Sequence, residues 1–185
     1  SSDLKNEKIP GTEKTADNET VGTNQVVTYT VKGAQVAKYD LTTYTEEKLK
    51  YWITDTLPAG LTFNDDIKVY NNATKDKKGK YNFNDADLLT LGTDYTMATK
   101  GENDTYTFKV ELNGKQVTKQ EGKSIYVVYS ATATNPTIGN TGNTNSASTD
   151  YTNNPNGGVY TSPKNNTVYS FEIKVEKTGD EKDKN

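Results

Sequence analysis

The side chains that could carry out chemistry in this sequence are carboxylates, amines, amides and hydroxyls. The chain has 25 acidic and 22 basic residues, but it contains no histidine and no cysteine. General acid–base catalysis near neutral pH and imidazole metal ligation therefore lack their usual residue. The absence of cysteine excludes disulfides, thiolate metal sites and thiol nucleophiles.

The spacing of the reactive residues matches no familiar catalytic motif. The GxSxG, HExxH, Walker and glycine-rich phosphate-binding patterns are all missing from the sequence. The run from Asn82 to Asp87 alternates side-chain oxygens as a calcium loop does. It lacks the glycine and the distal glutamate of such a loop, and we interpret it as a solvated turn. The sequence therefore predicts a protein that is not an enzyme and that uses no cofactor and no metal.

Strands of alternating polarity must position any reactive side chain. Apolar residues recur with a period of two over 25–31, 51–56, 105–112, 124–132 and 167–175. In the strand at 51–56, Asp55 shares a face with Tyr51 and Ile53, so its carboxylate points inward if those two side chains do. A buried acid has a reason to exist only if it is paired or has a chemical role.

The segments between these strands have the composition of turns and loops. Asn113-Gly114 is the strongest short signal for a hairpin turn. Residues 71–80 and the Asn-, Thr-, Gly- and Ser-rich stretch 135–166 predict solvated loops, and 41–50 predicts a helical turn or two. Short strands without a long amphipathic helix predict an all-β fold, an Ig-like or Greek-key β-sandwich with at most a short helical insert.

Composition limits the partners of the chain. The formal net charge is −3 and the one basic block is 75–80, so we expect no nucleic-acid partner. No apolar run approaches the roughly 20 residues of a membrane span. Hydrophobic residues make up 31% and aromatic residues 10%, which indicates a folded chain with a thin core. No signal peptide is visible, and we interpret the chain as a segment of a larger protein.

Five sequence blocks, in the same order, resemble the isopeptide-forming, D2-type domains of Gram-positive, sortase-assembled fimbrial or pilus subunits. The blocks are VG at 21–22 with VTYTV at 27–31, WITDTLPAGLTF at 52–63, GNTNSA at 142–147, YTNNP at 151–155 and VYSFEIKVEK at 168–177. They cover about residues 5–177, and ITDTLPAGL is the most specific of them. One departure is Thr23, which stands where the family usually has an aspartate.

The resemblance implies a spontaneous amide cross-link, an isopeptide bond, between a lysine on the first strand and an asparagine on a late strand. It places the buried acid that promotes this bond at Asp55 and the acceptor at Asn145. For the nucleophile we favour Lys8, with Lys14 and Lys5 as alternatives because this polar segment does not fix its own register.

Simple electrostatics is compatible with such a trio. An amine must be neutral to attack, and burial lowers the pKa of a lysine while it raises the pKa of an aspartate. A protonated aspartate can then hydrogen-bond the amide oxygen and stabilise its developing charge. The side chains available for an apolar wall around the trio are Tyr29, Tyr51, Trp52 and Phe171.

The resemblance also implies a place and a role. The domain is expected to span 1–176, followed at 177–185 by a charged tail that leads to a next module. We expect a load-bearing shaft module of an extracellular, cell-wall-anchored pilus or surface protein, in contact with neighbouring pilin modules or subunits. Sortase would act on regions outside this segment. The alternative is an adhesin module that binds a host matrix protein or glycan through 135–166 or 75–80.

Overall fold

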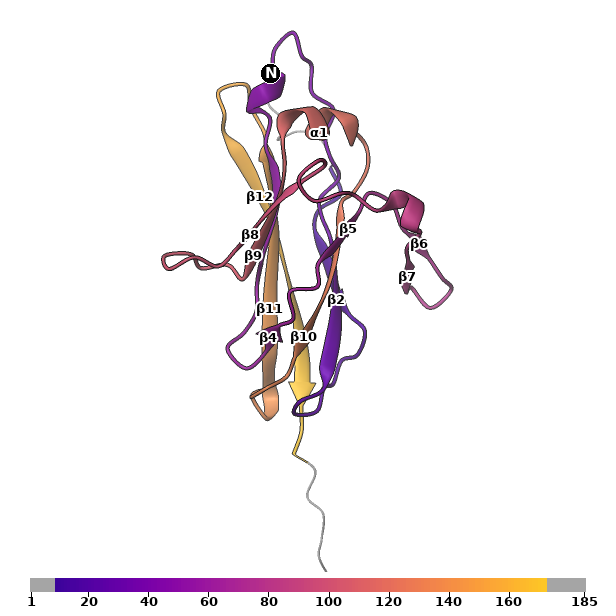
Figure 1. Cartoon of the computed structure of the whole chain (residues 1–185), viewed down its shortest axis with the longest axis vertical. Coiled ribbons are helices and arrows are strands. Elements are labelled where there is room, and N and C mark those ends of the chain that lie inside the picture. Colours follow the sequence, from indigo (N-terminus) through magenta and orange to yellow (C-terminus); the bar gives the residue numbers. More distant parts are fainter. Residues whose placement is uncertain (1–8, 173–185) are drawn as a thin grey trace, which may run out of the picture.

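The computed structural model describes residues 9–172. Two antiparallel sheets pack face to face with their strands along the long axis of the molecule (Figure 1). The first sheet has the order β1 (Glu13–Ala16), β2 (Val26–Lys32), β10 (Tyr126–Thr132), β4 (Thr62–Phe63), with β5 (Lys68–Tyr70) also paired to β10. The second sheet has the order β12 (Val159–Ser170), β11 (Gly139–Thr152), β3 (Tyr51–Thr56), β9 (Phe108–Leu112), β8 (Thr96–Thr99).

Small elements decorate this sandwich. The strands β6 (Thr74–Lys75) and β7 (Tyr81–Asn82) form a separate hairpin that projects from one side (Figure 1). The helical elements of the described residues are the single-turn η2 (Glu46–Lys48) and η3 (Asp85–Asp87) and the short helix α1 (Gly114–Lys119). The all-β sandwich with a short helical insert, predicted from the sequence, is confirmed.

The core lies between the sheets and follows the alternation read from the sequence. In β3 the side chains of Tyr51, Ile53 and Asp55 are buried, whereas the residues between them are partly exposed. The same period of two appears in β2, β9 and β10. Inward aromatic and β-branched side chains from both sheets thus fill the space that a sandwich must exclude from water.

The predicted hairpin turn at Asn113-Gly114 is wrong, because these residues begin helix α1. The Asn113 side-chain oxygen accepts a hydrogen bond from the Gln116 backbone nitrogen at 3.0 Å and caps the helix. A Cβ on Gly114 would lie 1.8 Å from the Glu46 carbonyl oxygen, so this glycine is required by the close approach of η2. The chain then crosses to the first sheet, where β10 pairs with β2, β4 and β5.

The predicted loop at 135–166 is also wrong over most of its length. It forms β11 and the first two thirds of β12, two long paired strands with Asn145 opposite Asn166. Burial alternates along β11, but several of the inward positions are polar. An alternation of apolar and polar residues is therefore missing from the sequence of this strand. The strand predicted at 167–175 is the end of β12, which stops at Ser170; residues beyond 172 lie outside the described part.

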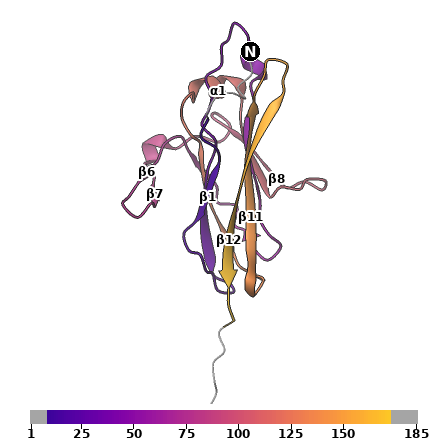
Figure 2. The ribbon, with the colours of Figure 1, turned by 180° about the vertical axis from the view of Figure 1, so that it is seen from behind.

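The described chain enters and leaves at opposite ends of the sandwich. It begins near α1, where the Pro10 carbonyl accepts from the Gln35 backbone nitrogen, and it leaves at the end of β12 (Figure 1). Strands β1 and β12 lie side by side where the two sheets meet, and Thr20 forms a parallel bridge with Tyr169 (Figure 2). Within residues 9–172, no helix has the length and apolar character needed to cross a membrane.

Candidate functional site

The first strand turns one lysine into the sandwich. In β1, Glu13 and Thr15 are exposed, whereas Lys14 is only 4% exposed and lies opposite Val31 of β2. Two residues earlier, on the same side of the extended chain, Thr12 is clamped to the second sheet. Its hydroxyl contacts the Thr149 hydroxyl at 2.7 Å, and its backbone nitrogen donates to the Ser162 hydroxyl at 3.0 Å. We call these contacts of Thr12 with Thr149 and Ser162 the threonine clamp. They determine which side chains of this extended segment face the interior, and they direct Lys14 inward.

The second sheet supplies the acid and the amide. Asp55, near the end of β3, lies between Phe108 of β9 and Ala147 of β11 and is fully buried. Asn145 lies two residues before Ala147 on the inward face of β11 and is also fully buried. The alternation in β3 therefore directs Asp55 as the sequence predicts, and β11 brings Asn145 to the same level.

Tyr129 of β10 joins the three groups. The Lys14 ammonium nitrogen donates to Asp55 Oδ2 and, at 3.1 Å, to the Tyr129 hydroxyl oxygen. The Tyr129 hydroxyl donates to Asp55 Oδ1 at 2.8 Å. The Asn145 amide nitrogen donates to the Tyr129 hydroxyl oxygen at 2.5 Å. A lysine and a tyrosine of the first sheet thus meet an aspartate and an asparagine of the second in the interior.

Aromatic rings enclose this quartet, which we define as Lys14, Asp55, Tyr129 and Asn145. The Lys14 nitrogen lies 4.7 Å from the centroid of the Tyr29 ring and 5.3 Å from that of Tyr129. The Phe108 ring packs edge to face on Tyr129 at 4.9 Å, and the Phe63 ring does so at 5.9 Å. The quartet is therefore a polar island in an apolar wall that excludes water.

Burial drives the charged groups toward their neutral forms. It lowers the pKa of Lys14 from the ordinary lysine value, and the negative charge of Asp55 opposes this change. It raises the pKa of Asp55, against the opposing influence of Lys14, Tyr129 and Asn145. Both pKa shifts favour the transfer of a proton from the Lys14 amine to the Asp55 carboxylate.

The Asn145 carbonyl oxygen is a buried acceptor of the quartet that lacks a partner within residues 9–172. Asn145 Oδ1 is buried and has no hydrogen-bond partner among the described residues. Leaving such an acceptor unpaired costs about 1–3 kcal/mol. A carboxyl group that has taken the lysine proton is a donor of the kind this oxygen needs.

The three residue types predicted for the cross-link, an acid, an amide and a lysine, meet in this site. Asp55 and Asn145 are buried in one site, and the lysine beside them is Lys14, one of the two alternatives. Lys8, the favoured nucleophile, and Lys5 lie outside the described residues. We therefore assign the amine of the site to Lys14.

The predicted apolar wall is only partly correct. Tyr29 belongs to it, but the hydroxyl of Tyr51 is bonded to the Ala34 carbonyl, away from the quartet. Trp52 bonds Asp150 instead, and Phe171 is 54% exposed. Sequence reasoning overlooked Phe63, Phe108 and Tyr129. The available signal for Tyr129 was its place between Val127 and Ala131 on the inward face of its strand.

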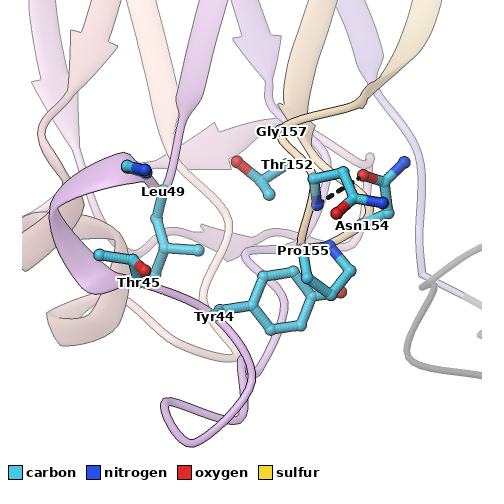
Figure 3. Close-up of a pocket in the computed structure, with 9 residues that line it drawn as sticks. Tyr44, Thr45, Leu49, Thr152, Asn154, Pro155 and Gly157 are labelled. Carbon is cyan, nitrogen blue, oxygen red and sulfur yellow. Dashed lines mark hydrogen bonds between the residues drawn. The ribbon is translucent and has the colours of Figure 1, made fainter.

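Other candidate sites carry less chemistry. At the α1 end, a pocket of about 300 Å³ lies between the segment around Tyr44 and Leu49 and the turn from β11 to β12 (Figure 3). The Asn154 side-chain oxygen, which points into this turn, accepts from the Asn156 and Gly158 backbone nitrogens at 3.0 Å each and so closes the turn itself. The run at 82–87 holds the end of β7 and the single-turn η3, which the Asn84 side chain caps. Residues 9–172 hold no cluster of acids suited to a metal ion.

Solved structures similar to this chain include pilins and an adhesin domain of bacteria. The T6 backbone pilin of Streptococcus pyogenes is similar with a TM-score of 0.60 and 20% identity over 86% of this chain and 36% of that pilin. The major pilin SpaD of Corynebacterium diphtheriae has a TM-score of 0.57 and 20% identity over 86% of this chain and 34% of its own length. The N-terminal domain of the Streptococcus gordonii adhesin Sgo0707 has a TM-score of 0.57 and 13% identity, with coverage of 88% and 33%.

Neither the protein-family models nor the curated proteins give a match to this sequence. The chain spans about a third of the length of the two pilins. At these identities the likeness establishes the fold, and function must be argued from the site. The chain has the sandwich fold of Gram-positive major pilins.

Proposed function

We propose that this chain is a load-bearing module of a pilus or related surface fibre, locked internally by an isopeptide bond between Lys14 and Asn145. The observation that carries the proposal is the buried contact of Lys14 with Asp55, in a site that Asn145 shares. A lysine and an acid without solvent are costly to keep for stability alone, because desolvation offsets most of their attraction. A chemical role gives the pair a reason to exist.

The chemistry proceeds in three balanced steps. The Lys14 ammonium first gives a proton to the Asp55 carboxylate, which leaves a neutral amine beside a neutral acid. The amine nitrogen then attacks the Asn145 side-chain carbon, and the protonated Asp55 stabilises the negative charge that develops on the amide oxygen. The lysine nitrogen finally loses a proton and the Asn145 nitrogen gains one, after which the tetrahedral species expels ammonia and leaves a new amide between the two side chains. The reaction occurs once per molecule, so the chain is not an enzyme in the usual sense.

The position of the bond suits a fibre. Lys14 belongs to the strand by which the chain enters the sandwich, and Asn145 belongs to β11, which is paired with the exit strand β12. Tension from one end to the other would pass from Lys14 directly to Asn145 and would bypass the residues between them. Most of both sheets would then carry no load, and the bypass would consist of covalent bonds.

The remaining expectations belong to the same proposal. The module would act outside the cell, in contact with neighbouring pilin modules or subunits of a cell-wall-anchored structure. Sortase would act on regions outside this segment. The boundary expected at 176–177 lies outside the described residues and stays a prediction.

Intact-mass spectrometry with peptide mapping tests the proposal. The purified chain should weigh less than its sequence by one ammonia, and digestion should release the Lys14 peptide joined to the Asn145 peptide. A chain with its full unmodified mass would contradict the isopeptide bond. A link from Lys8 or Lys5 to Asn145 would keep the bond but contradict the assignment to Lys14.

An adhesin module is the second candidate. It is favoured by the likeness to the Sgo0707 adhesin domain and by the pocket at the α1 end, whose lining combines Tyr44 with Pro155 and several amides (Figure 3). The β6–β7 hairpin with its lysines offers another protruding surface. Saturable binding of the purified module to immobilised matrix proteins or glycans would support this role. Binding that is absent, or that does not saturate, would support a shaft module.

A further inference from the structure

One buried hydroxyl touches every participant of the proposed reaction. The Tyr129 oxygen lies 3.1 Å from the Lys14 nitrogen, which would attack, and 2.5 Å from the Asn145 nitrogen, which would leave. It donates its own hydrogen to the Asp55 carboxylate at 2.8 Å. Tyr129 is 1% exposed, so bulk solvent does not reach these contacts.

The reaction needs such a group because two nitrogens must exchange a proton. After the attack, the Lys14 nitrogen carries a positive charge and must lose a proton to become an amide nitrogen. The Asn145 nitrogen is a poor leaving group until it gains a proton and departs as ammonia. Asp55 has already taken one proton from Lys14 and uses it to stabilise the amide oxygen, so a separate group in contact with both nitrogens is well placed for the exchange.

We infer that Tyr129 is a catalytic residue that relays this proton from the lysine nitrogen to the departing amide nitrogen. The inference rests on the proposed function. The Tyr129 oxygen accepts a proton from the Lys14 nitrogen while its own proton passes to the Asn145 nitrogen. The bond from that nitrogen to the side-chain carbon then breaks, the carbonyl re-forms and ammonia leaves. Tyr129 ends as it began, and the protons balance.

The surroundings of the hydroxyl suit a relay and disfavour a free phenolate. Burial and the negative charge of Asp55 raise the pKa of Tyr129 well above its ordinary value. The hydroxyl must therefore gain one proton as it gives up the other. The Tyr129 hydroxyl hydrogen now bonds the Asp55 carboxylate. Once Asp55 is protonated, this hydrogen can turn to the Asn145 nitrogen instead. Among the described residues, the Tyr129 hydroxyl is the one that forms hydrogen bonds to Lys14, Asp55 and Asn145 together.

Tyr129→Phe tests the relay, because it removes the hydroxyl and keeps the ring that packs on Phe108 and Phe63. The matched control is Tyr51→Phe, which removes another fully buried hydroxyl, one that bonds the Ala34 carbonyl at 2.7 Å outside the quartet. Each chain is made by cell-free synthesis and quenched in denaturant at successive times, and the linked fraction is read from the intact mass. Circular dichroism reports the fold.

We expect Tyr129→Phe to fold and to link more slowly by a factor on the order of 10²–10⁴, as for the loss of a general acid–base group. Tyr51→Phe should link at the wild-type rate. Equal rates for Tyr129→Phe and the wild type would overturn the relay and leave the isopeptide bond intact. A wild-type chain that never loses ammonia would overturn both proposals.

A second variant covers the case in which Tyr129→Phe does not fold. 4-Fluorophenylalanine at position 129 fills the volume of the hydroxyl but has no proton to give. We expect this chain to fold and to link slowly, by the same factor as above. Linking at the wild-type rate would overturn the relay.

Discussion

Lys14 and Asp55 come from different sheets and meet in the dry interior of the sandwich, with the Lys14 side chain donating to the Asp55 carboxylate. Lys14 lies on the edge strand of the first sheet, and Asp55 lies on the central strand of the second. Any covalent bond formed at this point joins the two layers. The pair therefore connects local chemistry to the mechanical behaviour of the whole domain.

Replacement of the acid should prevent the link without disrupting the fold. Asp55→Asn keeps the shape of the side chain but cannot take the lysine proton. We expect the variant to keep its full mass and to lose about 5 kcal/mol of stability, because the cross-link closes a loop of more than a hundred residues. The midpoint of thermal unfolding should fall by about 10–20 °C. Calorimetry and intact mass measure the two effects.

The matched control is Asp150→Asn, which makes the same change on β11. Asp150 accepts from the Trp52 indole nitrogen at 2.6 Å and lies outside the quartet. This variant should link fully and should keep its thermal midpoint within a few degrees. Complete linking of Asp55→Asn would show that the acid has no part in the reaction.

Removal of the lysine should make stability depend on pH through Asp55. Burial already raises the pKa of Asp55 above its ordinary value of 3.8, and Lys14 opposes the rise. In Lys14→Met the folded chain keeps the Asp55 proton at pH values where the unfolded chain has lost it. The stabilising contribution is therefore fully present below pH 3.8 and is lost as the pH rises through the folded-state pKa.

Urea denaturation of Lys14→Met between about pH 4 and about pH 8 measures this dependence. The reference is the double variant Lys14→Met/Asp55→Asn, in which the remaining ionisable group of the quartet is Tyr129, whose pKa is raised well above its ordinary value. The free energy of unfolding of Lys14→Met relative to this reference should fall as the pH rises. A constant difference over this range would contradict the burial of an ionisable Asp55.

Single-molecule pulling should distinguish the linked from the unlinked domain. Without the bond, unfolding of residues 14–170 releases a contour length of roughly 50 nm. With the bond, residues 15–144 are bypassed, and the released length should stay below roughly 10 nm. Asp55→Asn provides the unlinked reference. A long extension from a chain shown by mass to be linked would contradict the proposed load path.

The threonine clamp should position Lys14 for the reaction. Thr149→Val removes the hydroxyl that contacts the Thr12 hydroxyl at 2.7 Å and accepts from the Ala34 backbone nitrogen at 3.0 Å. We expect a loss of about 1–3 kcal/mol, because buried partners are left unpaired, together with slower linking. Denaturation and a time course of intact mass measure the two effects.

Thr144→Val is the control for the clamp, since it breaks an exposed Thr144–Thr167 hydroxyl contact of 2.8 Å on the same strand. It should change stability by less than about 0.5 kcal/mol and should link at the wild-type rate. Equal effects of the two threonine variants would contradict a specific role for the clamp.

The sequence by itself determined the strands that bury apolar side chains on one face. Period-two alternation identified β2, β3, β9 and β10, because each buries one apolar face. The same alternation directed Asp55 inward. The family-like blocks pointed to Asp55 and Asn145, which the structure buries in one site.

Only the tertiary structure decided the rest, because long-range contacts override local signals. Gly114 begins a helix since η2 packs against it, and β11 is a strand since its inward polar groups find partners far away in the chain. The choice of Lys14 depends on the threonine clamp, in which Thr12 bonds Thr149 and Ser162. These two residues lie 137 and 150 positions after Thr12 in the sequence. The central place of Tyr129 arises where two sheets face each other, and no single strand contains that information.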